Sequence, residues 1–317
     1  MISILGNSTN AILGTLIVVL SLSCSDSSNS SVKSLLKDYE IRGDVLEVDS
    51  NNSTVMVKIL AEGNELALAS SSANEVVRFQ VQPGDLSLLE NKITFRSMVQ
   101  ESFSPVYGKI HLLHRVWPDD RVERIRFNNV NRLLRRDTLS MGDDMIRGVG
   151  DFVPPFALYD QDGSIITSEY FDGSITVLNF IFSRCSIAEM CPASTLKMKK
   201  LQDLVAKTNI PYVRFLSITL DPEYDTPGIL KSYARAYDLD EQNFKLGTAG
   251  KTVIDDLTRQ FGILRKNEEE LPLDHTMRTL MINQKRQIIW QVPGKNWSVE
   301  DFLSRMDSSE VETTKSL

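Results

Sequence analysis

Two predominantly apolar runs of strand length constrain the fold of this 317-residue chain more than any other feature. They are Ile175–Phe182 (ITVLNFIF) and Val213–Leu220 (VRFLSITL). A strand with one solvated face alternates apolar and polar residues, whereas near-continuous apolar runs are typical of strands covered on both faces. Between the runs, four apolar residues recur at helical spacing: Leu196, Leu201, Leu204 and Val205. The pattern predicts a strand–helix–strand unit, and therefore an α/β fold.

The residues after the second run complete this α/β pattern. Asp225-Thr226-Pro227 predicts a helix start, with a capping side chain followed by proline at the first helical position. The remaining expected elements are a helix at Lys251–Phe261, a hairpin of Thr276–Ile282 and Gln287–Val292, and a closing helix at Ser298–Met306. This order is that of a thioredoxin-like domain, which we place at residues 151–309, followed by a polar tail at 310–317.

An all-β region precedes this domain. Short alternating or apolar stretches, separated by turn residues, predict strands around Val45–Val48, Val55–Ile59, Val76–Val81, Lys92–Val99 and Lys109–Val116. They favour a small barrel or sandwich over residues 38–118. The polar, Arg-rich stretch 119–150 is interpreted as a linker or an interdomain strap, for which solvation is favoured over contact with anionic lipid.

The N-terminus has the layout of a secretory signal. Ala11–Leu22 is almost wholly apolar but short for a membrane span, and a Ser-rich stretch follows Cys24. We expect a signal peptide at residues 1–23 and a flexible tether at 24–37. Cys24 after a small residue resembles the lipobox of bacterial lipoproteins, which implies lipid attachment at Cys24. An uncleaved signal anchor is the alternative. Both place the remaining chain on the periplasmic side of a bacterial cell envelope, anchored to the membrane.

The supply of soft metal ligands is short. The chain has three cysteines and three histidines, which excludes a disulfide-dense scaffold and any site with four thiolates. Its net charge of −7 argues against a nucleic-acid partner. Cys185 and Cys191 directly follow the first buried strand and precede the first long helix, at the sheet edge where ligands bind in open α/β folds. The start of a helix there favours a thiolate over a thiol.

His275 is the third candidate ligand. It lies just before an expected strand, whose start faces the same end of a thioredoxin-like sheet as the cysteine loop. Two thiolates and an imidazole suit copper as Cu⁺ or Cu²⁺, whereas structural zinc usually has four protein ligands. Two alternatives stay open at this point: an inert disulfide between Cys185 and Cys191, and a histidine that is only hydrogen-bonded.

Residues from Asp151 to Met306 resemble the SCO/SenC family of copper-binding cytochrome oxidase assembly proteins. The matching pieces are Pro155–Gly163 (PFALYDQDG), Leu178–Cys185 (LNFIFSRC), Cys191-Pro192, Ser217–Pro227 (SITLDPEYDTP) and Asp274-His275-Thr276. The resemblance implies copper ligation by Cys185, Cys191 and His275. It also implies a role in maturing the binuclear copper centre of oxidase subunit II, or a similar copper-accepting protein, as copper donor, thiol reductase or both. The family's usual spacing is C-x₃-C, whereas this chain has C-x₅-C.

Three acidic residues stand near these ligands. The resemblance implies a role for Asp221 and Asp225 near the site, although helix capping is the favoured interpretation of Asp225. Asp274 either orients His275 or is an exposed turn residue.

Residues from about Tyr39 to Val99 also faintly resemble copper-binding barrels of the CusF type. Leu60–Ala73 has no His, Met or Trp, so we expect a docking or spacer role there.

The leading hypothesis is an exported, membrane-tethered copper chaperone. A thiol–disulfide oxidoreductase that reduces the target's cysteines is the enzymatic alternative, in which Cys185 and Cys191 are the catalytic pair. A non-catalytic assembly scaffold is the third hypothesis. A peroxidase is less favoured, because Cys185 lacks the Thr-x-x-Cys pattern of peroxiredoxins.

Overall fold

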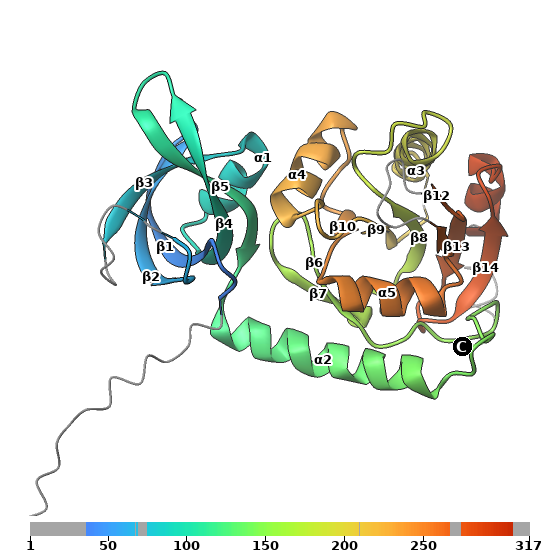
Figure 1. Cartoon of the computed structure of the whole chain (residues 1–317). Helices are drawn as coiled ribbons and strands as arrows, with labels where there is room; N and C mark the ends of the chain where they lie inside the picture. The colour runs from blue at the N-terminus through green and yellow to red at the C-terminus, as the bar shows by residue number, and fades with distance from the viewer. Residues whose placement is uncertain (1–35, 67, 69–74, 209, 267–273, 307–317) are drawn as a thin grey trace, which may run out of the picture. The chain divides into compact units, whose positions relative to one another are not determined.

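The computed structural model describes residues 36–66, 68, 75–208, 210–266 and 274–306 (Figure 1). The expected signal peptide, Cys24 and the polar tail at 310–317 lie outside the described residues. Residues 34–317 cluster into one compact unit. Among the residues described, no helix is long and apolar enough to cross a membrane.

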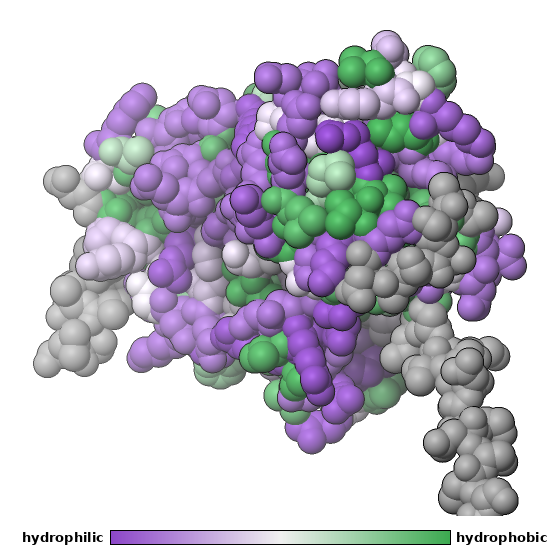
Figure 2. All heavy atoms as spheres, turned by 90° about the vertical axis from the view of Figure 1, so that its left-hand side faces the viewer, coloured by the Kyte–Doolittle hydropathy of each residue, from purple (hydrophilic) through white to green (hydrophobic). Residues whose placement is uncertain are grey.

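The first five strands close into a barrel, which is one of the two architectures that the sequence favoured. They are β1 (Glu40–Asp49), β2 (Thr54–Glu62), β3 (Val76–Val81), β4 (Thr94–Ser104) and β5 (Gly108–Pro118), in the order β1-β2-β3-β5-β4. Alternation along β2 turns Val55, Val57 and Ile59 inward. Figure 2 views the molecule from the barrel side of Figure 1 and shows a mostly hydrophilic surface, with apolar side chains in separate patches.

A helix lies where the sequence indicated only a turn. Pro83-Gly84-Asp85 begins α1 (Pro83–Leu89), which connects β3 to β4. Proline at the first helical position and an acidic residue in the first turn are helix-start signals as well as turn signals. Leu86, Leu88 and Leu89 are buried, which anchors this short helix through its packing.

The Arg-rich connector is largely helical. In α2 (Arg121–Ser140), Asp120 caps the first turn by accepting from the Glu123 amide at 2.8 Å. Asn131, Leu134 and Thr138 form a buried stripe at spacings of three and four residues. The Asn131 side chain donates to the Ala157 carbonyl and accepts from the Ala157 amide, both at 3.0 Å. The connector is therefore a packed helix.

The second sheet has five strands in the order β10-β9-β8-β13-β14. β8 (Ile175–Ile181), β9 (Val213–Thr219) and β10 (Phe244–Gly247) are parallel, whereas β13 (Arg278–Ile282) and β14 (Ile288–Pro293) form the predicted antiparallel hairpin. Every residue of β8 is buried. The helices are α3 (Cys191–Val205), α4 (Pro227–Ala236), α5 (Lys251–Gln260) and residues 299–306. The expected mixed α/β architecture is present.

Short elements connect these layers. They are β6 (Ala157–Tyr159), β7 (Ile165–Thr167), the 3₁₀ helix η1 (Ser168–Phe171), β11 (Arg265–Lys266) and β12 (Asp274–His275). β11 and β12 pair with each other, outside the five-stranded sheet.

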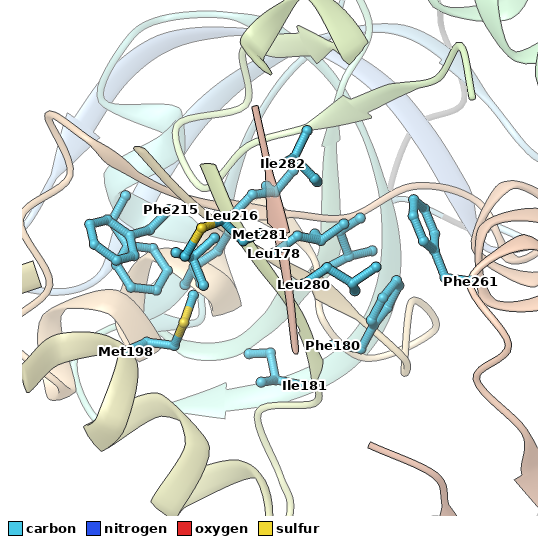
Figure 3. Close-up of a cluster of buried hydrophobic side chains, with 14 of the residues drawn as sticks. Leu178, Phe180, Ile181, Met198, Phe215, Leu216, Phe261, Leu280, Met281 and Ile282 are labelled. Atoms are coloured by element: carbon cyan, nitrogen blue, oxygen red, sulfur yellow. The ribbon is translucent and has the colours of Figure 1, made fainter. Parts of the chain in front are cut away.

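Side chains from three neighbouring strands fill the core of this sheet. Figure 3 shows residues of β8, β9 and β13 packed together, with Met198 approaching from α3. On the other side of the cluster, the rings of Phe180 and Phe261 lie 5.7 Å apart between centroids. Burying each such side chain stabilises the fold by roughly 1.5–3 kcal/mol, so β8 is a rigid support for the loop that follows it.

Candidate metal centre

The two cysteines lie at the carboxyl end of the buried central strand. β8 ends at Ile181, the chain passes through Cys185, and Cys191 is the first residue of α3. Both cysteines are free and buried. The thiol of Cys191 therefore stands at the positive end of a 15-residue helix.

The two thiols differ in acidity because one donates to the other. A hydrogen bond from the Cys191 thiol lowers the pKa of Cys185 to about 6, with a further contribution from the Cys191 amide. The same hydrogen bond and burial raise the pKa of Cys191 above its ordinary value. Cys185 is therefore the more acidic of the two thiols.

His275 faces this pair from β12. Its ring is 6% exposed, and its Nε2 atom lies 3.7 Å from Cys191 Sγ. Its Nδ1 atom lies 3.0 Å from the Thr276 carbonyl oxygen. A carbonyl only accepts, so the neutral ring carries its proton on Nδ1 and directs the Nε2 lone pair toward Cys191. Phe182 contacts the ring edge-on at 5.7 Å between centroids.

The structure places His275 next to Cys191, and Cys191 next to Cys185. A metal with bonds of about 2.0 Å to nitrogen and 2.3 Å to sulfur separates its two donors by roughly 3.5–3.7 Å. The separation of 3.7 Å between His275 Nε2 and Cys191 Sγ matches this requirement. Within the described ranges, no group of three His, Cys, Asp or Glu side chains is already arranged to hold a metal ion.

Asp225 does not cap α4, which corrects the sequence interpretation. The N-cap is Thr226, and it makes no side-chain capping bond. The fully buried carboxyl group of Asp225 instead accepts from the Ser183 amide at 3.0 Å, from the Ser183 hydroxyl, and from the Thr219 hydroxyl at 2.5 Å. Burial raises the pKa of Asp225 to about 6, although these hydrogen bonds oppose the rise. Asp225 thus ties the start of the cysteine loop to the end of β9.

Asp221 binds the same loop from outside. Its Oδ2 atom lies 2.6 Å from Arg184 Nε, and the Arg184 guanidinium lies 4.5 Å from the centroid of the Tyr224 ring. Asp274 contributes backbone pairing with Lys266 in the β11–β12 ladder. Its expected role beside His275 falls on a side chain outside those described.

Sequence reasoning missed four contributors to the site: Ser183, Arg184, Thr219 and Tyr224. A usable signal was present, because Ser183 and Thr219 are polar residues at the carboxyl ends of two strongly apolar strands. Their common partner, Asp225, is 42 residues from Ser183 in the chain, so local patterns do not identify it.

Comparison with known proteins identifies relatives of the part of the chain that holds these residues. The sequence profile described as SCO1/SenC matches residues 145–309. The SCO1 protein homolog of Bacillus subtilis is 29% identical over 161 residues, which cover 50% of this chain and 82% of that protein. A second relative is the solved structure of BsSco, which is described as a member of the Sco family of cytochrome c oxidase assembly proteins with a disulfide switch. It is 27% identical in sequence and has a TM-score of 0.45. The match covers 52% of this chain and 97% of that one.

A third relative is a copper-bound crystal structure. Arabidopsis thaliana ScoI with copper bound is 21% identical with a TM-score of 0.45, and the match covers 52% of this chain and 99% of that one. Because the family profile spans 165 of the 317 residues (145 to 309), slightly more than half of the sequence, the assignment is clear. The chain belongs to the SCO1/SenC family.

Proposed function

We propose that this protein is an exported, membrane-tethered copper chaperone that binds one copper ion through Cys185, Cys191 and His275. The observation that carries the proposal is the approach of His275 Nε2 to Cys191 Sγ at 3.7 Å, beside a thiol whose pKa is lowered. Two sulfur donors and one imidazole accept Cu⁺ and also tolerate Cu²⁺. The description of a related structure as copper-bound supports the choice of metal.

The two thiols have different roles in the proposed binding of copper. Cys185 is already a thiolate near neutral pH and offers the first sulfur donor. Cys191 loses its proton on binding, so uptake of copper releases a proton, and binding strengthens as pH rises. His275 supplies Nε2 without losing a proton, because its Nδ1 proton is held by the Thr276 carbonyl.

The proposed recipient is the binuclear copper centre of cytochrome c oxidase subunit II, or a similar copper-accepting protein. Support comes from the description of BsSco as an oxidase assembly protein. We place the copper site in a thioredoxin-like domain at 151–309. A barrel domain at 38–118 and a connector at 119–150 precede this domain in the sequence. Attachment of lipid to Cys24 would hold the chain at the periplasmic surface of a bacterial membrane, where such a recipient is reached.

Metal analysis of the purified, copper-loaded full chain tests the proposal. We expect about one copper per wild-type chain and a large loss in H275A. H114A is the matched control, because His114 lies on β5 of the barrel, and it should bind as wild type does. Equal copper content in wild type and H275A would contradict the three-ligand site.

A thiol–disulfide oxidoreductase is the second candidate, favoured by the unequal acidity of the thiols. The Cys185 thiolate would attack a target disulfide and release one target thiolate, forming a mixed disulfide. Cys191, once deprotonated, would attack that disulfide and release the second target thiolate. The target gains two electrons, and a Cys185–Cys191 disulfide remains.

The reduction potential of the Cys185–Cys191 couple distinguishes the oxidoreductase from the other proposed functions. A Cys185–Cys191 couple far below about −300 mV behaves as structural and does not cycle, which would remove the oxidoreductase. Turnover unaffected by H275A would instead favour it. Function that persists in the C185S/C191S double variant would leave only an assembly scaffold.

A further inference from the structure

The segment between β9 and α4 contacts two parts of the chain at once. On one side, Asp221 and Asp225 bind Arg184 and Ser183 of the cysteine loop. On the other side, Glu223 and Thr226 bind residues of the barrel. We call residues 220–226 the bridging loop. A displacement of this loop would be transmitted to the residues next to Cys185.

The barrel contact centres on a buried carboxyl group. Asp85 of α1 is fully buried, and its Oδ1 atom accepts a hydrogen bond from the Thr226 hydroxyl at 3.1 Å. The Val116 amide, at the end of β5, donates to the same carboxyl group. Within the described part of the chain, Oδ2 has no hydrogen-bond partner. Burial raises the pKa of Asp85 to about 7.

A pair of glycines lets the two helices touch. A Cβ atom at Gly228 would lie 2.4 Å from the Gly84 carbonyl oxygen and 2.5 Å from Asp85 Oδ1. A Cβ atom at Gly84 would lie 2.8 Å from the Gly228 carbonyl oxygen. Backbone contact this close admits only glycine at these positions. Figure 1 shows the resulting pairing of α1 with α4.

The contact also involves the first turn of α4. Its N-cap residue, Thr226, makes no side-chain capping bond to the helix, and its hydroxyl donates to Asp85. Asp85 Oδ1 lies beside Gly228, the second residue of α4. The barrel therefore places a carboxyl group beside the first turn of α4.

A second contact reaches the bridging loop from β5. Arg115 Nη1 lies 3.2 Å from Glu223 Oε2, with side chains that are 46% and 57% exposed. Exposed ion pairs of this kind contribute little to stability. The Asp85–Thr226 hydrogen bond and the glycine contact are therefore the main contacts between the barrel and the bridging loop with α4.

From these contacts we propose that Asp85 is a positioning residue for the cysteine pair. Through Thr226 it holds the bridging loop where Asp225 and Asp221 can bind Ser183 and Arg184. The barrel is then a fixed support for the cysteine loop. This role deepens the proposed copper-chaperone function, although its test uses the protein without copper.

Two quantities report directly on the proposed connection in the reduced, metal-free full chain. The first is the hydrogen-exchange rate of the Ser183 amide, which donates to Asp225. The second is the rate of alkylation of Cys185 by iodoacetamide, followed on its own peptide by mass spectrometry. We expect D85A and T226V each to speed Ser183 exchange at least tenfold and to change the Cys185 alkylation rate at least threefold. D85N keeps the acceptor for Thr226 and should restore both rates to within twofold of wild type.

Two controls separate positioning from general loss of stability. D49A removes an exposed barrel carboxylate that accepts from the Asn51 and Asn52 amides, far in sequence from the bridging loop. R115A removes only the exposed pair with Glu223. Both should leave both rates within twofold of wild type.

Three results would overturn the inference. These are unchanged rates in both D85A and T226V, failure of D85N to restore them, or an equal increase in D49A. T226V keeps the shape of threonine, so it tests the hydrogen bond even if D85A folds poorly. If D85A speeds exchange while the wild-type chain binds no copper, the positioning role stands and the chaperone function fails.

Discussion

At the scale of single residues, the site depends on an unequal pair of thiols. Cys191 has its proton held between two sulfur atoms, and Cys185 gains acidity from that proton. Five residues lie between the two cysteines, so this contact requires the loop to fold back onto the start of α3. The longer C-x₅-C spacing is thus compatible with direct contact between the thiols.

The pH dependence of alkylation tests this arrangement. Only the thiolate reacts, so the rate at Cys185 should rise with pH around a midpoint near 6, compared with about 8.5 for an ordinary cysteine. C191A removes the donated proton and should move the midpoint toward the ordinary value. Peptide-resolved mass spectrometry across pH 4–10 gives both profiles. A wild-type midpoint near 8.5 would rule out the hydrogen bond.

Asp85 makes a second prediction at this scale, through its effect on stability. The folded protein keeps the Asp85 proton up to about pH 7, whereas the ordinary aspartate value is 3.8. The folded state therefore binds more protons in this window, and the free energy of unfolding falls as pH rises from about 4 to about 7. Asparagine at this position has no such dependence.

We expect the stability of wild type relative to D85N to fall by an amount on the order of 3 kcal/mol across this window. Urea unfolding of the full chain at pH 5, 6, 7 and 8 measures the difference. Other carboxyl groups are common to both proteins and cancel. Parallel curves, or a difference that grows in favour of wild type as pH rises, would show that Asp85 does not titrate in this way.

At the scale of elements, α2 shows how little apolar surface is needed to fix a polar helix. Leu134 is fully buried on the packed side of α2, whereas Leu139 is 65% exposed. L134A should lower the free energy of unfolding by about 2–5 kcal/mol because it leaves a cavity. L139A should change it by no more than about 0.5 kcal/mol. Equal effects in urea unfolding would mean that α2 is not packed through this stripe.

The elements also show what sequence patterns could and could not establish. β8 and β9 were predictable because they are buried on both faces and therefore predominantly apolar. The α1 helix was not, because Pro83-Gly84-Asp85 signals a turn and a helix start equally, and its contacts come from the distant α4. The helix in the connector was not recognised from the sequence, because most of its positions face solvent.

The site divides in the same way. Cys185, Cys191 and His275 could be selected because their types are rare and their places at strand ends follow from the α/β pattern. Asp225 was assigned to a helix cap because Asp-Thr-Pro is a common helix start. Tertiary contact with Ser183 and Thr219 outweighed that local preference, since a buried carboxyl group needs every available donor.

At the scale of the whole molecule, residues 34–317 contain two separate apolar cores, one in the barrel and one around the five-stranded sheet. The contacts of α1 with α4 connect them at the loop that supports the cysteines. A barrel connected in this way is positioned to influence the site. The proposed chaperone function depends on all three ligands acting together.

X-ray absorption spectroscopy of the copper-loaded full chain tests that claim most directly. The account predicts two sulfur donors at about 2.3 Å and one nitrogen donor at about 2.0 Å, taking zinc bond lengths as a guide. In the fraction of copper that H275A retains, the nitrogen donor should be lost while both sulfur donors remain. A wild-type shell without nitrogen, or a shell that H275A leaves unchanged, would contradict the three-ligand copper site.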